Sequence, residues 1–124
     1  MKVLLAAILL LALPAGPAFA DGDAAKGEKV FKKCMACHTV AEATNKVGPH
    51  LVGIVGRKAA SVEGYKYSDD LIAMGAAGTV WDEATLDKYV TNPKTVAPKG
   101  KMAFAGLKKE DERVNLIAYL KTKM

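Results

Sequence analysis

Cysteine is scarce in this chain: 124 residues include only two, Cys34 and Cys37. Because both belong to one short run, no thiol remains for a separate disulfide framework or zinc site. Dense blocks of basic residues are also missing, which argues against a nucleic-acid-binding protein, although 18 basic and 13 acidic side chains give a formal net charge of +5. Internal repeats, linkers and low-complexity segments are absent from the sequence as well. These absences predict one small domain.

The longest apolar run lies at the N-terminus and is too short for a membrane span. Lys2 supplies a positive charge, and an apolar stretch from Val3 to Leu13 follows before proline and glycine interrupt it, whereas a spanning helix needs about 20 apolar residues. Ala18-Phe19-Ala20 then has the small-x-small pattern of a cleavage site. We therefore expect a secretory signal peptide over residues 1–20, cleaved after Ala20, and a folded domain over residues 21–124. A retained membrane anchor is the alternative.

The most informative run that is present is Cys34-Met35-Ala36-Cys37-His38, which matches the attachment signature of c-type haem. Two thiols one helical turn apart can each add to a vinyl group of one porphyrin, and this places the His38 imidazole beneath the iron as an axial ligand. A redox-active dithiol or a lone disulfide is the alternative interpretation of two cysteines at this spacing. The adjacent histidine and the export signal favour haem, because c-type haem is attached outside the bacterial inner membrane. The predicted location is the periplasm.

Apolar residues recur at helical spacing, and no segment shows the sustained alternation of a strand. The expected helices run from a cap at Asp21 or Asp23 to about Lys33, from Ser68 to Met74 with an end at Gly75, from Asp82 to Thr91, and from about Lys109 to Lys123. Residues 44–60 and 92–101 are expected to be loops, with Pro93 stopping the third helix. The predicted fold class is all-α.

The iron position opposite His38 decides between electron transfer and ligand chemistry, because only an open position can bind a substrate or a gas. Met102 is the favoured second ligand, since it follows the loop segment 98–101, which can lay a thioether across a porphyrin with little backbone obstruction. Met74 lies in a helical pattern, where methionine is more often core filler. His50, more typical of a surface histidine, and an open position are the remaining alternatives.

An ordered series of further motifs extends over residues 23–122. The series comprises Gly27-x-x-x-Phe31, Cys34-x-x-Cys37-His38, the stretch from Asn45 to Arg57, Gly64-Tyr65-Lys66-Tyr67-Ser68, Trp81, Tyr89-x-x-Asn92-Pro93-Lys94, Lys101-Met102-x-Phe104-Ala105-Gly106 and Leu116-Ile117-Ala118-Tyr119-Leu120. In these motifs the chain resembles the class I c-type cytochromes, most closely the bacterial cytochrome c2 proteins, which are similar to mitochondrial cytochrome c. The resemblance implies a small class I cytochrome c fold, in which the N- and C-terminal helices cross and loops wrap one covalent haem.

The resemblance also implies roles for single residues. Pro49 is expected to accept a hydrogen bond from His38, and Tyr89 to reach toward the sulfur of Met102. Four residues are expected to hydrogen-bond the inner propionate, Phe104 to cover the ring near its exposed edge, and the Gly27 motif to cross the terminal helix near Leu116 and Tyr119. The implied haem-binding residues are Cys34, Cys37, His38, Pro49, the propionate group Arg57, Tyr65, Tyr67 and Trp81, and finally Tyr89, Met102 and Phe104, with His38 and Met102 as iron ligands.

Three features depart from the family pattern. Gly100 stands where many relatives have a hydroxyl residue, two positions before the expected ligand methionine. His50 stands at a position where the family commonly has a residue with a polar amide side chain. The segment Asp69–Thr79 is somewhat longer than in mitochondrial cytochrome c.

As to function, the resemblance implies a soluble periplasmic electron carrier with one His/Met-ligated haem, cycling between Fe(II) and Fe(III), and not an enzyme. A cytochrome bc complex is the expected donor, and a reaction centre, oxidase or reductase the expected acceptor. Acidic docking surfaces on these partners are expected to meet lysines that match the rim of the exposed haem edge, namely Lys33, Lys46, Lys94, Lys101, Lys108 and Lys109. We expect a monomer without nucleic-acid partner or stable membrane insertion after cleavage. The rivals are an enzyme or gas sensor with an open iron position, and a carrier tethered by a retained N-terminal segment.

Overall fold

The computed structural model describes residues 21–124, so the predicted signal peptide and its cleavage site lie outside the described residues. Its helices in chain order are α1 (Ala24–Phe31), α2 (Asp69–Ala76), α3 (Glu83–Thr91), α4 (Pro93–Val96) and α5 (Glu110–Lys121). Over this range the β-structure amounts to a single antiparallel bridge between Lys58 and Val80. The prediction of an all-α fold is confirmed. In the same range, no helix combines the length and apolar character needed to cross a membrane.

Three of the helices are capped by polar residues that lie at their predicted starts. The side chains of Asp23, Ser68 and Asp82 each accept a hydrogen bond from the backbone amide three residues later, at 3.1, 3.4 and 2.8 Å. Each bond satisfies one of the amides that the first helical turn leaves without an intrahelical partner. Because these caps are local, the predicted helix boundaries agree with the observed ones to within one or two residues.

The segment after α3 differs from the prediction, because residues 92–101 are not all loop. Asn92 leaves the helical conformation with φ −161° and ψ 96°, and Pro93 then occupies the start of the short helix α4. Proline is suited to this position, since the amide it lacks would have no partner within the helix. Pro93 therefore follows the end of one helix and begins another.

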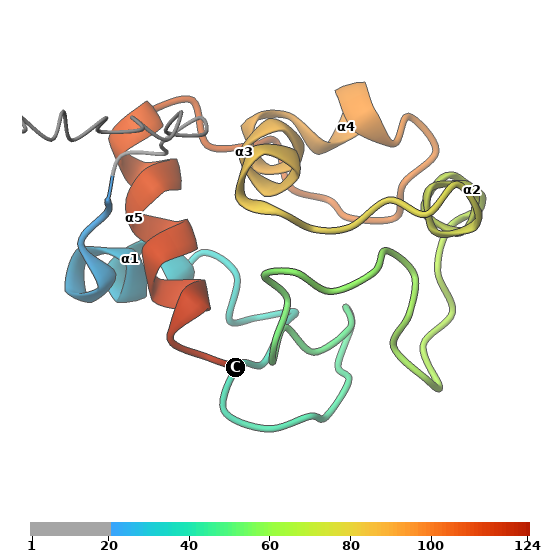
Figure 1. Cartoon of the computed structure of the whole chain (residues 1–124), viewed down its shortest axis with the longest axis horizontal. Coiled ribbons are helices and arrows are strands. Elements are labelled where there is room, and N and C mark those ends of the chain that lie inside the picture. Colours follow the sequence, from blue (N-terminus) through green and yellow to red (C-terminus); the bar gives the residue numbers. More distant parts are fainter. Residues whose placement is uncertain (1–20) are drawn as a thin grey trace, which may run out of the picture.

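The N- and C-terminal helices cross at very short range, as the sequence predicts (Figure 1). A Cβ atom on Gly27 would lie 1.9 Å from the carbonyl oxygen of Asn115 and 2.8 Å from the Cβ atom of Tyr119. Phe31 packs against Tyr119 one turn later, with ring centroids 5.5 Å apart, and Leu116 is buried beside them. The crossing therefore depends on the absence of a side chain at Gly27.

Long loops complete the hydrophobic core that the helices begin. The segment between α1 and α2 runs along the side of the molecule opposite α3 and α4 (Figure 1). Helices and loops both supply the buried apolar cluster, which consists of Phe31, Val40, Ile54, Ala59, Trp81, Leu86, Leu107, Leu116, Ile117 and Leu120. Because the loops share the core with the helices, residues far apart in sequence are held together around the Cys34–His38 motif.

Candidate functional site

The Cys34–His38 motif forms tight turns that continue directly from the end of α1. The amide of Cys34 donates to the carbonyl of Phe31 at 2.8 Å, and the amide of His38 donates to the carbonyl of Cys34 at 2.9 Å. Cys34 and Cys37 are free and half-buried. Burial raises the pKa of the Cys34 thiol, although Lys33 partly opposes this. A raised pKa disfavours the thiolate that a redox-active dithiol requires, so the burial of Cys34 does not favour that alternative.

The His38 ring is fixed through one of its two nitrogens. Its Nδ1 lies 2.7 Å from the carbonyl oxygen of Pro49, the hydrogen bond predicted from the sequence. Because a carbonyl can only accept, Nδ1 carries the proton and Nε2 keeps its lone pair for a metal. Burial lowers the pKa of His38, against the Pro49 hydrogen bond, which raises it. The neutral ring favoured by burial is the form that coordinates iron.

The backbone of Gly48 lies directly against the same ring. A Cβ atom at Gly48 would lie 2.3 Å from Cε1 of His38 and 2.8 Å from its Nδ1. The amide of Gly48 also donates to the carbonyl of Cys37 at 2.8 Å, which fixes this loop to the motif. No role of its own was predicted for Gly48 from the sequence, although a glycine beside Pro49 is a signal for close backbone approach.

Two buried polar atoms near this loop have no hydrogen-bond partner among residues 21–124. Arg57 donates through Nη1 to the carbonyls of His50 at 3.0 Å and Val52 at 3.2 Å. Its Nε, however, and the Nδ1 atom of His50 are buried and unpaired within that range. A buried polar atom without a partner costs about 1–3 kcal/mol. The guanidinium N–H is therefore suited to an acidic group from outside the chain, such as the propionate of a haem.

The predicted aromatic residues form two pairs. The rings of Tyr65 and Tyr67 lie edge to face with centroids 4.8 Å apart, and those of Trp81 and Tyr89 lie 4.9 Å apart. Tyr65 donates its hydroxyl hydrogen to the carbonyl of Val47 at 3.1 Å. The Tyr67 oxygen instead accepts a backbone hydrogen bond at 3.0 Å, so its own hydrogen remains available to donate. Burial raises the pKa of both Tyr65 and Tyr89 above the ordinary value of 10.0.

The three candidates for the second axial ligand have different surroundings. Met74, on α2, packs against the hydrophobic core. His50 lies in the loop that Arg57 fixes, and its amide donates to Oδ1 of Asn45 at 3.0 Å. Met102 is half-buried on the coil segment between α4 and α5, and Phe104 of the same segment packs against the core.

The predicted docking lysines are exposed, and most of them are held by other parts of the chain. Lys46 Nζ donates to the carbonyl of Met35 at 2.9 Å, and Lys108 Nζ donates to that of Thr91 at 3.0 Å. Lys101 Nζ donates to the carbonyl of Lys66 at 3.2 Å, and Lys94 Nζ donates to that of Gly100. Lys33 instead forms an ion pair with Glu112 at 3.5 Å. A neutral carbonyl orients an ammonium group without cancelling its charge. Four of these side chains therefore present a full positive charge at defined positions.

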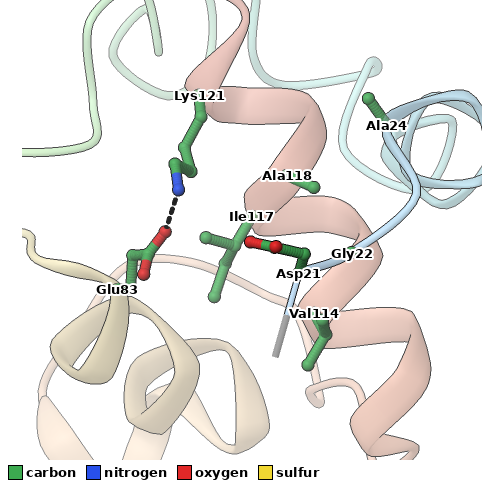
Figure 2. A pocket seen from close by; sticks show the side chains of 8 residues that line it. All are labelled: Asp21, Gly22, Ala24, Glu83, Val114, Ile117, Ala118 and Lys121. Carbon is green, nitrogen blue, oxygen red and sulfur yellow. Dashed lines mark ion pairs between the residues drawn. The ribbon is translucent and has the colours of Figure 1, made fainter. Parts of the chain in front are cut away.

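A cavity of about 190 Å³ lies elsewhere, between the start of the described chain and helices α3 and α5 (Figure 2). Ile117 forms part of its apolar lining, and the ion pair between Lys121 Nζ and Glu83 Oε1, 2.6 Å apart, lies beside it. None of the predicted haem-site residues lines this cavity. The Cys34–His38 motif and its loops therefore form a site separate from it.

Comparisons with known proteins give a consistent result. The family model described as cytochrome c matches residues 24–123. The chain is 51% identical to cytochrome c-554 of Methylosinus trichosporium over 94% of this chain and 86% of the relative. Its identity to cytochrome c-550 of Ancylobacter novellus is 57%, over 79% of this chain and 92% of the relative. Among solved structures, cytochrome c2 from Rhodospirillum centenum has a TM-score of 0.77 at 39% identity, covering 82% of this chain and 98% of that one.

Proposed function

The chain belongs to the cytochrome c family, and from this premise we propose that it is a soluble periplasmic carrier of single electrons between membrane redox complexes. Membership and the relatives make it a cytochrome c2-like electron carrier with one haem c bound through Cys34 and Cys37. The observation that carries the proposal is the placement of His38, whose Nδ1 is engaged by Pro49 at 2.7 Å while Nε2 keeps its lone pair.

The residues around the motif fit a haem at this place. Two free thiols are available for the thioether bonds, and Gly48 leaves room for the His38 ring. The unpaired Nε of Arg57 and the free hydroxyl hydrogen of Tyr67 suit a propionate, with Trp81 as a further candidate. Tyr65, the fourth candidate, would have to turn its hydroxyl hydrogen from the carbonyl of Val47 to reach that group. The haem supplies the one-electron Fe(II)/Fe(III) couple, and the chain binds it, orients it and shields it from water.

We assign the second axial position to Met102. The packing of Met74 against the core supports this choice, as does the place of Met102 on a coil segment that also carries Phe104. A soft thioether favours ferrous iron and raises the potential, and Tyr89 is placed in this proposal near the sulfur. With His38 and Met102 as its two protein ligands the iron would have no open position for a substrate, which favours a carrier over an enzyme.

The ligand assignment is tested by optical spectra of the ferric holoprotein. Wild-type protein should show the weak far-red band of an iron–methionine bond. The Met102→Ala variant should lose this band and have a much lower potential, while Cys34, Cys37 and His38 retain the haem. Met74→Leu is the matched control and should keep both properties. A band that survives in Met102→Ala but not in Met74→Leu would reassign the ligand, and a high-spin wild-type spectrum would favour the enzyme or gas-sensor alternative.

Export and processing are tested by intact mass of the protein recovered from the periplasm. The expected mass is that of residues 21–124 plus one haem, since the sequence predicts cleavage after Ala20. A membrane-bound holoprotein that keeps residues 1–20 would instead support the tethered carrier. A Cys34→Ala/Cys37→Ala variant should yield no stable holoprotein. Accumulation of that variant as a folded domain without haem would contradict the idea that haem organises the core.

The proposed partners are a cytochrome bc complex as donor and a reaction centre, oxidase or reductase as acceptor. The support is electrostatic: the exposed lysines of the predicted docking group carry charge at defined positions, and such a surface attracts acidic docking sites.

A further inference from the structure

The segment that carries Met102 has few hydrogen bonds of its own. The amide of Ala97 donates to the carbonyl of Pro93 at 2.8 Å, and the amide of Gly100 donates to the carbonyl of Ala97 at 2.9 Å. Gly100 has no side chain to hold the segment, and glycine leaves its backbone freer than any other residue. The position of Met102 therefore depends on contacts from other parts of the chain.

One such contact comes from the first turn of α2. The carboxylate of Asp70 accepts a hydrogen bond through Oδ2 from the backbone amide of Lys99, at 2.6 Å. This bond joins residues 29 positions apart in the sequence. A carboxylate is a stronger acceptor than a neutral oxygen, and the bond fixes the backbone directly rather than a mobile side chain.

Helix α2 is itself a firm support for this contact. Its first turn is capped by Ser68, whose hydroxyl accepts from the amide of Leu71. Leu71 and Met74 pack against the core. At Gly75 an added Cβ atom would lie 2.5 Å from the carbonyl oxygen of Ala59, so the helix lies directly on the backbone of the preceding loop. Displacement of the Lys99 amide would therefore have to break its bond to a fixed acceptor.

A second contact holds the segment on the other side of Gly100. Lys101 Nζ donates to the carbonyl of Lys66 at 3.2 Å, and Lys66 precedes α2 in the chain. Both hydrogen bonds lie at the surface, but this one depends on a long flexible lysine side chain, so we expect it to hold the segment less firmly than the Asp70 bond. Lys94 Nζ, on α4, also donates to the carbonyl of Gly100, again through a flexible side chain. The Asp70 bond is the contact that ties a backbone amide of the segment to α2.

We propose that Asp70 is a positioning residue for Met102, which holds the Lys99 amide and so resists release of the thioether from the iron. This inference rests on the ligation by Met102 proposed above. Release of the thioether would require the segment around Gly100 to move, and that movement would break the bond to Asp70. Loss of the carboxylate should therefore make the iron position easier to open, without affecting attachment of the haem.

The test measures how tightly added imidazole binds the ferric holoprotein, because imidazole must displace Met102. Asp70→Ala should bind imidazole about fivefold more tightly than wild type, equivalent to about 0.95 kcal/mol at 1.36 kcal/mol per factor of ten. Asp70→Asn keeps an acceptor oxygen and should remain near wild type. Asp69→Ala is the matched control, since Asp69 also lies in the first turn of α2 and its loss has the same effect on the helix dipole.

Equal imidazole affinities for Asp70→Ala and Asp69→Ala would overturn the proposal, because Asp70 would then act only through the stability of α2. Hydrogen exchange of the Lys99 amide in wild-type ferric protein gives a second measurement that needs no variant. Protection of this amide is expected, and exchange at the rate of an unstructured peptide would also overturn the proposal. In a Met102→Ala background the Asp70→Ala effect should vanish. Imidazole affinity unchanged by Met102→Ala alone would instead refute the ligation on which the inference rests.

Discussion

At the scale of single residues, the site is organised by contacts that fix the orientation of the His38 ring. Pro49 holds Nδ1 at 2.7 Å, and Gly48 lies so close to the ring that no larger residue fits. A hydrogen bond at the ring nitrogen that does not bind the metal strengthens the other nitrogen as an electron-pair donor to the metal. Orientation and donor strength are therefore set by two consecutive residues of one loop.

This arrangement predicts a large effect of Gly48→Ala. The added Cβ atom would lie 2.3 Å from Cε1 of His38, and the loop cannot retreat without losing its 2.8 Å bond to Cys37. We expect a loss of about 1–3 kcal/mol in the free energy of unfolding, typical of overpacking, together with a changed redox potential. Denaturant unfolding and a redox titration of the holoprotein measure the two quantities.

The control for Gly48→Ala is Val47→Ala in the same loop. Val47 is 74% exposed, so its truncation should leave stability and potential nearly unchanged. Wild-type values of both quantities in Gly48→Ala would show that the loop can move away from the ring.

At the scale of helices, the individual elements are too short to be stable alone. Helices α1, α2 and α3 have 8, 8 and 9 residues, whereas isolated helices shorter than about 12–15 residues are marginal in water. Their stability must come from caps and from packing against other elements. The α1–α5 crossing at Gly27 and the cap at Asp82 are therefore expected to contribute to stability.

For the crossing, Gly27→Ala should destabilise the protein strongly. Alanine gains helix propensity by about 1 kcal/mol over glycine, but its Cβ atom would lie 1.9 Å from the carbonyl oxygen of Asn115. We expect the clash to dominate and the free energy of unfolding to fall by about 2 kcal/mol. Thermal or denaturant unfolding measures this, with the exposed Glu28→Ala of the same helix as control. An increase in stability would mean that propensity outweighs the helix contact.

For the cap, the pH dependence of stability should contain a contribution from Asp82. Hydrogen bonds from Thr85 hold the pKa of this carboxyl below its ordinary value of 3.8. Between the lowered pKa and 3.8 the unfolded chain binds more protons than the folded one, so stability rises with pH in this window. The contribution is complete above the ordinary pKa and is lost as the pH falls through the folded value.

The comparison that isolates Asp82 uses Asp82→Asn, because asparagine caps a helix about equally well but does not titrate. The difference in unfolding free energy between wild type and Asp82→Asn should be constant at neutral pH. As the pH falls below the ordinary pKa of 3.8, wild type should lose stability relative to Asp82→Asn. A difference that stays the same over the whole range would exclude a linked role for this carboxylate.

At the scale of the whole molecule, the lysines of the proposed docking group have unequal structural roles. Lys94 donates to the carbonyl of Gly100, so reversing its charge would disturb the Met102 segment as well as any partner contact. Lys109 only precedes α5, and its side chain forms no cap hydrogen bond to that helix. A substitution at Lys109 therefore tests docking without disturbing the Met102 segment.

We predict that Lys109→Glu slows association with a redox partner more than Lys26→Glu does, as measured by stopped-flow kinetics. Lys26 is exposed on α1, and we expect it to lie away from the haem edge. Because screening shortens to about 10 Å at 0.1 M salt, the wild-type rate should also fall steeply as salt rises. Equal effects of both reversals, or a rate independent of salt, would indicate docking through apolar contacts.

The sequence by itself determined the features that depend on residues close together in the chain. The spacing of Cys34, Cys37 and His38 specifies haem attachment within one turn, and Asp23, Ser68 and Asp82 mark helix starts because a cap bonds to an amide three residues later. The all-α class follows from apolar spacing in the same way. The ordered motifs also predicted the α1–α5 crossing at Gly27.

Only the tertiary structure decided which distant groups meet. Three kinds of contact join segments whose separation in sequence carries no pattern: Gly48 against the ring of His38, Asp70 against the amide of Lys99, and the bonds of Lys101 to Lys66 and Lys108 to Thr91. Such contacts depend on how the loops pack on the shared core, and an exposed aspartate or a loop glycine looks alike in sequence whether or not it has this role. The start of α4 at Pro93 belongs with them, because proline is equally suited to stop a helix and to begin one.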